Sequence, residues 1–167
     1  MNETMADERA AVFDSWVRAY GDDILRVCLA YLRNRADAED ASQETFLKAW
    51  QGLAGFADRH GSGAKPWLMR IAMNVCRDHY RSGWFRHVDR SWVPDENAVG
   101  GTEPADRAVT DAVLGLPGKL KQVLLLYYYQ NMTVREVAEA LQLSPAGVHK
   151  RLKAAEKRLR EQLEEEV

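Results

Sequence analysis

Basic side chains recur along the segment from Ser144 to Arg160, and binding of phosphate groups is the chemistry that their charge supports. Six basic residues stand there against the single acid Glu156, so the segment has a net charge of plus five. They are Lys150, Arg151, Lys153, Lys157, Arg158 and Arg160. A cationic helix of this kind can hold the backbone of a nucleic acid. A helix with a merely solvated basic face is the alternative interpretation.

Two predicted helix starts position this basic segment. Thr133 and Glu136 have the spacing of a capping box, and apolar residues then recur at helical intervals up to Leu141. After a short break, Ser144 is a favourable N-cap and Pro145 suits the first helical position. Two helices joined by so short a turn, the second one basic, are typical of a helix-turn-helix. Ordinary helical hairpins are also common, so this motif alone is a weak signal.

A second group of cations is mixed with aromatic residues between Lys65 and Arg90. Six basic residues stand against two acids in this stretch. The aromatic residues among and beside them are Trp67, Tyr80, Trp84, Phe85 and Trp92. Basic and aromatic side chains together can follow a phosphate backbone and stack on unpaired bases. The tryptophans can equally be core anchors, and for Trp67 both interpretations stay open.

Acidic and polar residues form a third group, on a helix expected to start with Asp37 as its N-cap. Small and apolar residues mark the buried side of this helix, whereas Asp40, Gln43, Glu44 and Leu47 fall on the other side. A charged face of this kind most often only contacts solvent. It can also dock on a basic partner, because complementary charge speeds association and fixes register.

Residues that could support catalysis or bind a metal are not clustered in the sequence. The four histidines are scattered, and His79 falls on an inner helical stripe, where we expect a satisfied core or boundary residue. Cys28 and Cys76 stand in apolar helical patterns, so we expect them to be buried in a reducing compartment; a disulfide or metal pair is the minor alternative. Nucleophile motifs and phosphate loops are absent. The sequence therefore predicts no enzyme activity, no cofactor and no metal site.

The apolar pattern predicts an all-α protein with two small helical domains. Alternating strand signals are sparse in the 167 residues. Residues 6–33 predict two helices with a break at Gly21–Asp22, and the Gly-rich segment 52–65 predicts a long loop of the functional kind. Residues 91–105 contain Pro, a Gly pair and acids, which predicts a flexible linker. The expected domains are therefore residues 1–90 and residues 106–167, the second containing the helix-turn-helix.

The charge balance and hydropathy limit the partners and the compartment. The net charge is −2, so binding of nucleic acid must come from local patches. The sequence has no run of eighteen apolar residues, and its first ten residues are acidic and polar. This predicts neither a membrane span nor a secretory signal, and hence a cytoplasmic protein without direct membrane insertion.

Four segments together resemble the extracytoplasmic-function (ECF) sigma factors of bacterial RNA polymerase, in the primary-sigma superfamily. They are DAEDASQETFLKAW (37–50), PWLMRIAMNVCRDHYR (66–81), LPGKLKQVLLLYY (116–128) and TVREVAEALQLSPAGVHKRL (133–152). Their order and separation also fit, and the resemblance covers nearly the whole chain. It implies a dissociable subunit that directs core polymerase to a specific set of promoters. The alternative is a two-domain helix-turn-helix regulator that binds duplex operators without polymerase.

The resemblance also implies a role for each segment. The acidic helix would dock on the clamp of the polymerase's largest subunit through Asp37, Asp40, Gln43, Glu44 and Leu47. The Gly-rich loop and the next helix would read the minus-ten element and capture an unstacked base through Phe56, Lys65, Trp67, Arg70, Asn74, Arg77, Tyr80 and Arg81. The second domain would contact the flap of the second-largest subunit. It would read the minus-thirty-five duplex through Ser144, Ala146, Gly147, His149, Lys150, Arg151 and Lys153.

Departures from the family pattern limit what the resemblance carries over. Gln142 stands in the turn where the family usually has Gly, at a cost of about 1 kcal/mol if the residue is left-handed. Ala154 replaces a basic residue, and Gly147 lies near the reading face. The promoter sequence is therefore not transferable from relatives. An anti-sigma factor is an expected partner, and no small-molecule substrate is expected.

Overall fold

The computed structural model describes residues 2–58, 61–87 and 104–165, and in these ranges the chain is helical with no strand. The helices are α1 (Asn2–Leu32), α2 (Arg35–Gly52), α3 (Lys65–His87), α4 (Pro104–Leu114), α5 (Gly118–Leu124), α6 (Val134–Leu141) and α7 (Pro145–Glu165). A 3-10 turn, η1 (Leu53–Gly55), follows α2, and a π-helical turn, η2 (Leu125–Tyr129), follows α5. The all-α prediction is confirmed. Most of the predicted linker, together with the side chains of Trp84, Phe85 and Trp92, lies outside the described residues.

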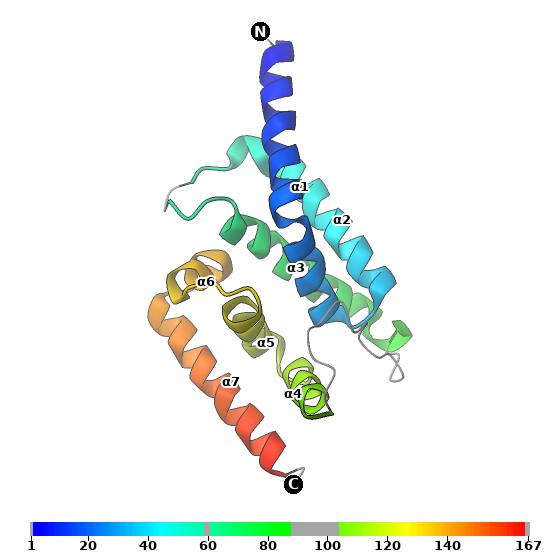
Figure 1. Cartoon of the computed structure of the whole chain (residues 1–167), viewed down its shortest axis with the longest axis vertical. Coiled ribbons are helices and arrows are strands. Elements are labelled where there is room, and N and C mark those ends of the chain that lie inside the picture. The colour runs from blue at the N-terminus through cyan, green and yellow to red at the C-terminus, as the bar shows by residue number, and fades with distance from the viewer. Residues whose placement is uncertain (1, 59–60, 88–103, 166–167) are drawn as a thin grey trace.

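The first half of the chain is a three-helix arrangement of α1, α2 and α3, and α1 extends beyond it at its N-terminal end (Figure 1). Its core is built from the apolar stripes that the sequence predicted, including Ile24, Val27, Leu68 and Ala72. Cys28 and Cys76 are free thiols in this core, and their sulfur atoms lie 3.5 Å apart. Burial of these stripes fixes which faces of α2 and α3 point outward.

Two local predictions in this half are wrong. α1 continues through Gly21 and Asp22 without a break. A glycine inside a helix costs only about 1 kcal/mol relative to alanine, and burial of the stripes on both sides of Gly21 outweighs that cost. The N-cap of α2 is Asn34 and not Asp37: the Asn34 side chain accepts a hydrogen bond from the Asp37 main-chain nitrogen at 2.9 Å. Asp37 lies in the first turn instead, where its charge complements the helix dipole.

The second half packs α4, α5 and α6 against α7, and it contains the predicted helix-turn-helix. The capping box is confirmed, since Thr133 and Glu136 exchange two hydrogen bonds of 3.1 Å. Gln142, in the turn between α6 and α7, is left-handed with a φ of 55°. The Ser144 hydroxyl then accepts from the Gly147 main-chain nitrogen at 3.0 Å, as expected of an N-cap. These contacts fix the angle at which α7 leaves the turn.

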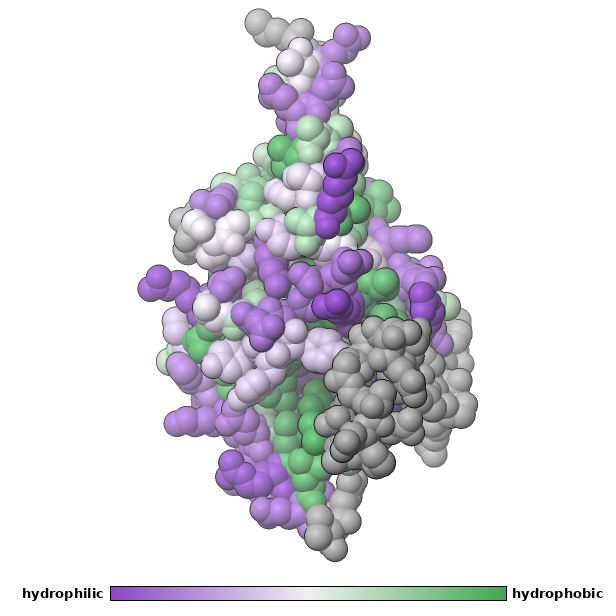
Figure 2. Space-filling view, viewed as in Figure 1, coloured by the Kyte–Doolittle hydropathy of each residue, from purple (hydrophilic) through white to green (hydrophobic). Residues whose placement is uncertain are grey.

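The two halves also pack against each other, mainly through α3 and α6, with a smaller contact between α1 and η2 (Figure 1). Lys65 at the start of α3 donates a hydrogen bond to the main-chain oxygen of Gln130 at 3.2 Å. The side chain of Gln130, itself buried, donates to the main-chain oxygen of Asp23 at 3.1 Å. Arg33 and Asp111 form an ion pair that also joins the two halves. The outer surface in this view is largely hydrophilic, with a narrow apolar strip in its lower half (Figure 2).

Candidate polymerase and nucleic-acid interfaces

The outer face of α2 combines charged, polar and apolar residues. Asp40 and Gln43 are exposed, and Leu47 keeps 57% of its surface exposed beside them. Asp37 is half-buried in the first turn. An exposed leucine among acids is more typical of a contact surface than of a purely solvated face, because interfaces combine an apolar centre with a polar rim.

Glu44 belongs to the same face but is held by the neighbouring helix. Its carboxylate lies 2.7 Å from Nε2 of His79 on α3 and 3.4 Å from Nζ of Lys48. The hydrogen bond to His79 lowers the pKa of Glu44 below its ordinary value, and the hydrogen bond to Lys48 acts in the same direction. His79 is thus a satisfied boundary histidine, as the sequence predicted. The sequence did not predict that its partner would be Glu44.

Aromatic residues from three segments meet where the Gly-rich loop leaves η1. The rings of Trp16 and Phe56 lie 5.0 Å apart, and Trp67 contacts both, at 5.7 Å from Trp16 and 5.1 Å from Phe56. Phe56 and Trp67 are half-buried in this cluster. For Trp67 the geometry therefore favours the core-anchor interpretation over a free stacking platform, and Phe56 shares that position.

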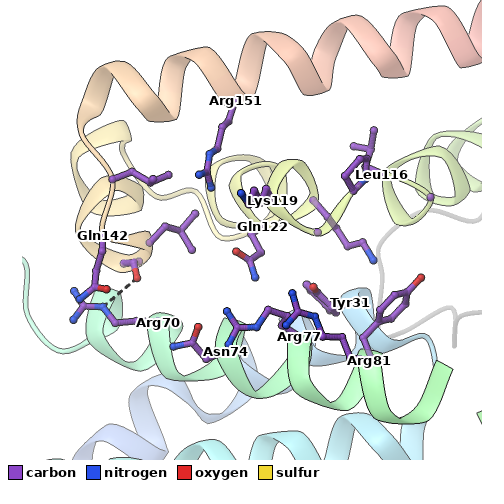
Figure 3. Close-up of a pocket in the computed structure, with 18 of the residues that line it drawn as sticks. Tyr31, Arg70, Asn74, Arg77, Arg81, Leu116, Lys119, Gln122, Gln142 and Arg151 are labelled. Atoms are coloured by element: carbon purple, nitrogen blue, oxygen red, sulfur yellow. Dashed lines mark hydrogen bonds between the residues drawn. The ribbon is translucent and has the colours of Figure 1, made fainter.

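The outer face of α3 points toward the helix-turn-helix (Figure 3). Arg70 donates from Nη2 to the main-chain oxygen of Glu139 at 2.6 Å, and from Nε to that of Ala140 at 3.2 Å. A guanidinium in this place satisfies carbonyls in the last turn of α6 and complements the negative end of its dipole. Asn74 is exposed. Arg77 and Arg81 lie about one and two turns further along the helix. Four of the predicted minus-ten residues therefore share one face.

The first turns of α7 present the predicted reading face. Ser144, Ala146, His149, Lys150 and Lys153 are all exposed, whereas Val148 and Leu152 are buried on the opposite side. Gly147 and Arg151 are half-buried. The exposed positions lie on the outside of the helix that the Gln142 turn orients, so they are accessible to a partner.

A cavity of about 700 Å³ lies between the two halves. It brings together Arg70, Asn74, Arg77, Tyr80 and Arg81 of α3 with Arg151 of α7. The structure thus places most of the predicted minus-ten residues opposite one predicted minus-thirty-five residue. Phe56, Lys65 and Trp67 do not line this cavity.

Lys121 is the residue of this region that sequence reasoning missed. Only 2% of its surface is exposed, and Nζ lies 4.5 Å from the ring centre of Tyr31 and 4.4 Å from that of Tyr80. Burial, with a further contribution from the Arg33 charge, lowers the pKa of Lys121 to about 8. Lysine is rarely fully buried, so the residue type argues against this position. The signal available for burial was the place of Lys121 in the apolar run that follows Lys119.

Among the residues that the structure describes, no group of three His, Cys, Asp or Glu side chains is placed to hold a metal ion. None of the described helices is long and apolar enough to cross a membrane.

Comparisons with known proteins match both halves. The sigma-70 region 2 family matches residues 16–86, and the sigma-70 region 4 family matches residues 106–159. The ECF sigma factor SigL of Mycobacterium tuberculosis is 32% identical over 95% of this chain and 86% of its own length. The sigma-E factor of Streptomyces avermitilis is 30% identical, with 96% and 89% covered. The probable sigma factor RfaY of Xanthomonas campestris is 34% identical over 88% of this chain, which spans 39% of that relative's length.

Solved structures show the same fold. CnrH, solved in complex with the cytosolic domain of CnrY, superposes with a TM-score of 0.73 at 25% identity, covering 98% of this chain and 97% of CnrH. The sigma factor RpoE of Bartonella quintana, solved with the anti-sigma factor NepR, gives a TM-score of 0.69 at 20% identity, covering 91% and 96%. Fold and matches together define a two-region sigma-70-type protein. The chain belongs to the ECF sigma factors and is an RNA polymerase sigma factor, as the four sequence segments indicated.

Proposed function

We propose that this sigma factor directs core polymerase to a specific set of promoters through three surfaces, one on α2, one on α3 and one on α7. The domain boundaries that we propose are those expected from the sequence, residues 1–90 and 106–167 with a linker at 91–105. The protein itself performs no catalysis in this proposal and needs no cofactor, since the polymerase carries out the chemistry.

The outer face of α2 is the proposed docking surface for the clamp of the largest subunit. The observation that carries this assignment is the exposure of Leu47 next to Asp40 and Gln43. An apolar contact bordered by acids fits a basic partner surface with an apolar centre. Glu44 contributes negative charge to this surface while it remains bound to His79.

The face of α3 and the start of α7 are the proposed DNA-binding surfaces. Arg70, Asn74, Arg77 and Arg81 would contact the minus-ten element, with the Phe56–Trp67 cluster supporting the base-capturing loop from behind. The exposed residues from Ser144 to Lys153 would enter the major groove of the minus-thirty-five element. The second half would also contact the flap of the second-largest subunit.

The direct contacts between the halves support a requirement for opening. Arg70 is engaged with α6, so it cannot contact DNA while the two halves stay in this arrangement. Binding of core polymerase would supply the energy to separate them, because a partner that binds only the open form shifts the equilibrium toward it. An anti-sigma factor that binds the closed form would oppose this, and we place both events in the cytoplasm.

Promoter binding with and without core polymerase tests the proposed function. The full chain alone should show weak binding to promoter duplex, and addition of core polymerase should produce a stable, promoter-specific complex. Tight sequence-specific binding of the chain alone, unchanged by core polymerase, would support the operator-binding regulator instead.

A further inference from the structure

The cavity between the two halves is lined by cations from both of them. α3 contributes Arg70, Arg77 and Arg81, and the second half contributes Lys119, Lys121, Arg151 and Arg158. None of the described residues that line the cavity is acidic. Figure 3 shows Arg77 and Arg81 on α3 facing Lys119 and Arg151 across the open space. Seven positive charges are thus gathered around a volume of about 700 Å³.

Within the described part of the chain, the contacts of Arg70 and Lys121 do not neutralise their charge. Arg70 binds neutral main-chain oxygens, and Lys121 lies over the rings of Tyr31 and Tyr80. Arg77 forms an ion pair with the carboxylate of its neighbour Asp78, with 3.4 Å between Nε and Oδ1. Both side chains are well exposed, so this pair offsets little of the charge. Like charges gathered around one cavity destabilise the closed arrangement, and an anion placed between them would offset this repulsion.

The volume and the hydrogen-bond donors of the cavity favour a compact anion. Its volume lies within the ordinary range of small-molecule sites and is too small for a duplex. Arginine side chains bind phosphate oxygens in a bidentate manner, and lysine binds them as a point charge. The amides of Asn74, Gln122 and Gln142 add further hydrogen-bonding groups on the same walls.

We propose that this cavity binds a polyphosphate chain, either inorganic or carried by a nucleotide, which bridges the two halves. A ligand that binds only the closed arrangement stabilises it in proportion to its concentration. It would also cover Arg70, Asn74 and Arg151, so it would compete with promoter DNA; this consequence rests on the proposed function, whereas the binding site itself does not.

Direct binding to the full chain tests the site, with inorganic tripolyphosphate as the probe and calorimetry as the measurement. One saturable site is expected. Arg158→Gln and Lys119→Gln, both at exposed positions, should each weaken binding roughly tenfold, the value of one charged hydrogen bond. Lys157→Gln is the matched control, since it removes the same charge from the neighbouring exposed position on α7 outside the cavity. Its affinity should equal that of the wild type.

Circular dichroism checks that the variants are folded. All three should retain the wild-type helix content and melting temperature. A parallel titration with ATP distinguishes the sources: tighter binding of ATP assigns a nucleotide, and binding of tripolyphosphate alone assigns an inorganic chain. Absence of saturable binding by either probe, or an equal loss in Lys157→Gln, would overturn the proposal. Neither result depends on polymerase or promoter DNA, so the proposed function would remain separately testable.

Discussion

Arg70 of α3 donates a hydrogen bond of 2.6 Å to the main-chain oxygen of Glu139 on α6. One residue thus joins the helix proposed to read the minus-ten element to the first helix of the helix-turn-helix. The described residues form both proposed DNA-binding surfaces, and the one on α3 is turned toward the second half of the chain. The structure therefore describes a sigma factor in a closed arrangement.

Removal of this contact should open the molecule. Arg70→Ala deletes charged hydrogen bonds of roughly 1.5–3 kcal/mol, so the ratio of closed to open forms should fall about tenfold or more. Dyes on Gln51→Cys and Glu161→Cys, both at exposed positions, report the distance between the halves. The native cysteines are buried and should not compete for labelling. An unchanged distance distribution in Arg70→Ala, matching that of the control Arg18→Ala, would refute the role of this contact.

The proposed docking face on α2 predicts sensitivity to charge reversal. Asp40→Lys should abolish co-purification with core polymerase and leave helix content intact, because the residue is exposed and makes no core contact. The control is Glu161→Lys, an equivalent reversal at an exposed position of α7. Retention of core binding by Asp40→Lys would show that this face is only solvated.

The Glu44–His79 contact predicts a loss of stability in acid. The pKa of Glu44 in the folded protein lies below its ordinary value of 4.5. The contact therefore contributes its full stability above pH 4.5, and this stability is lost as the pH falls through the folded-state pKa. Urea unfolding between neutral and acidic pH measures it. Glu44→Gln should show a shallower decline below pH 4.5 than the wild type. Parallel declines in the two proteins would assign the acid sensitivity to other carboxylates.

Lys121 predicts the opposite trend in mild alkali. Its pKa of about 8 in the folded protein lies below the ordinary 10.5, so the unfolded chain binds more protons between these values. The free energy of unfolding should therefore rise as the pH increases from about 8 toward 10. Above pH 10, the pKa of Tyr31, raised to about 12, has the reverse effect and lowers the free energy of unfolding as the pH increases. Lys121→Met should lack the rise, and its persistence in that variant would exclude Lys121 as the cause.

The exposed start of α7 predicts the salt dependence of DNA binding. Lys150→Ala should weaken binding of minus-thirty-five duplex by polymerase holoenzyme. If Lys150 contacts a phosphate, the salt slope should fall by about one; if it contacts a base edge, discrimination at one base pair should relax. Arg9→Ala, an exposed change on α1, serves as the control. A Lys150→Ala protein indistinguishable from that control would contradict the groove placement.

Local features of the fold followed from local sequence. The Thr133–Glu136 capping box, the Ser144 cap and the outward basic face of α7 all rest on contacts within a few residues, so spacing alone predicted them. The errors at Gly21 and Asp37 have a common cause. Gly21 has the weak helix propensity that suggests a break, and Asp37 has the chemistry of a cap, but packing and the competing cap Asn34 decided the outcome.

Contacts between distant segments were beyond the reach of periodicity. Nothing in the spacing indicates that Arg70 contacts Glu139, that Glu44 contacts His79, or that Lys121 is buried against the rings of Tyr31 and Tyr80. The contacts of Arg70 and Lys121 exist because the two halves pack together, and the Glu44–His79 contact exists because α2 packs on α3. Both kinds of packing depend on the complementarity of whole surfaces. The sequence therefore predicted which faces carry charge, but not which faces meet.

Run-off transcription from a library of promoter sequences, with core polymerase and the full chain, tests the central claim most directly. The account predicts transcripts only when the chain is present, from templates that share both a minus-ten and a minus-thirty-five element, and their loss with Asp40→Lys. Core polymerase that gives the same transcripts with and without the chain would contradict it.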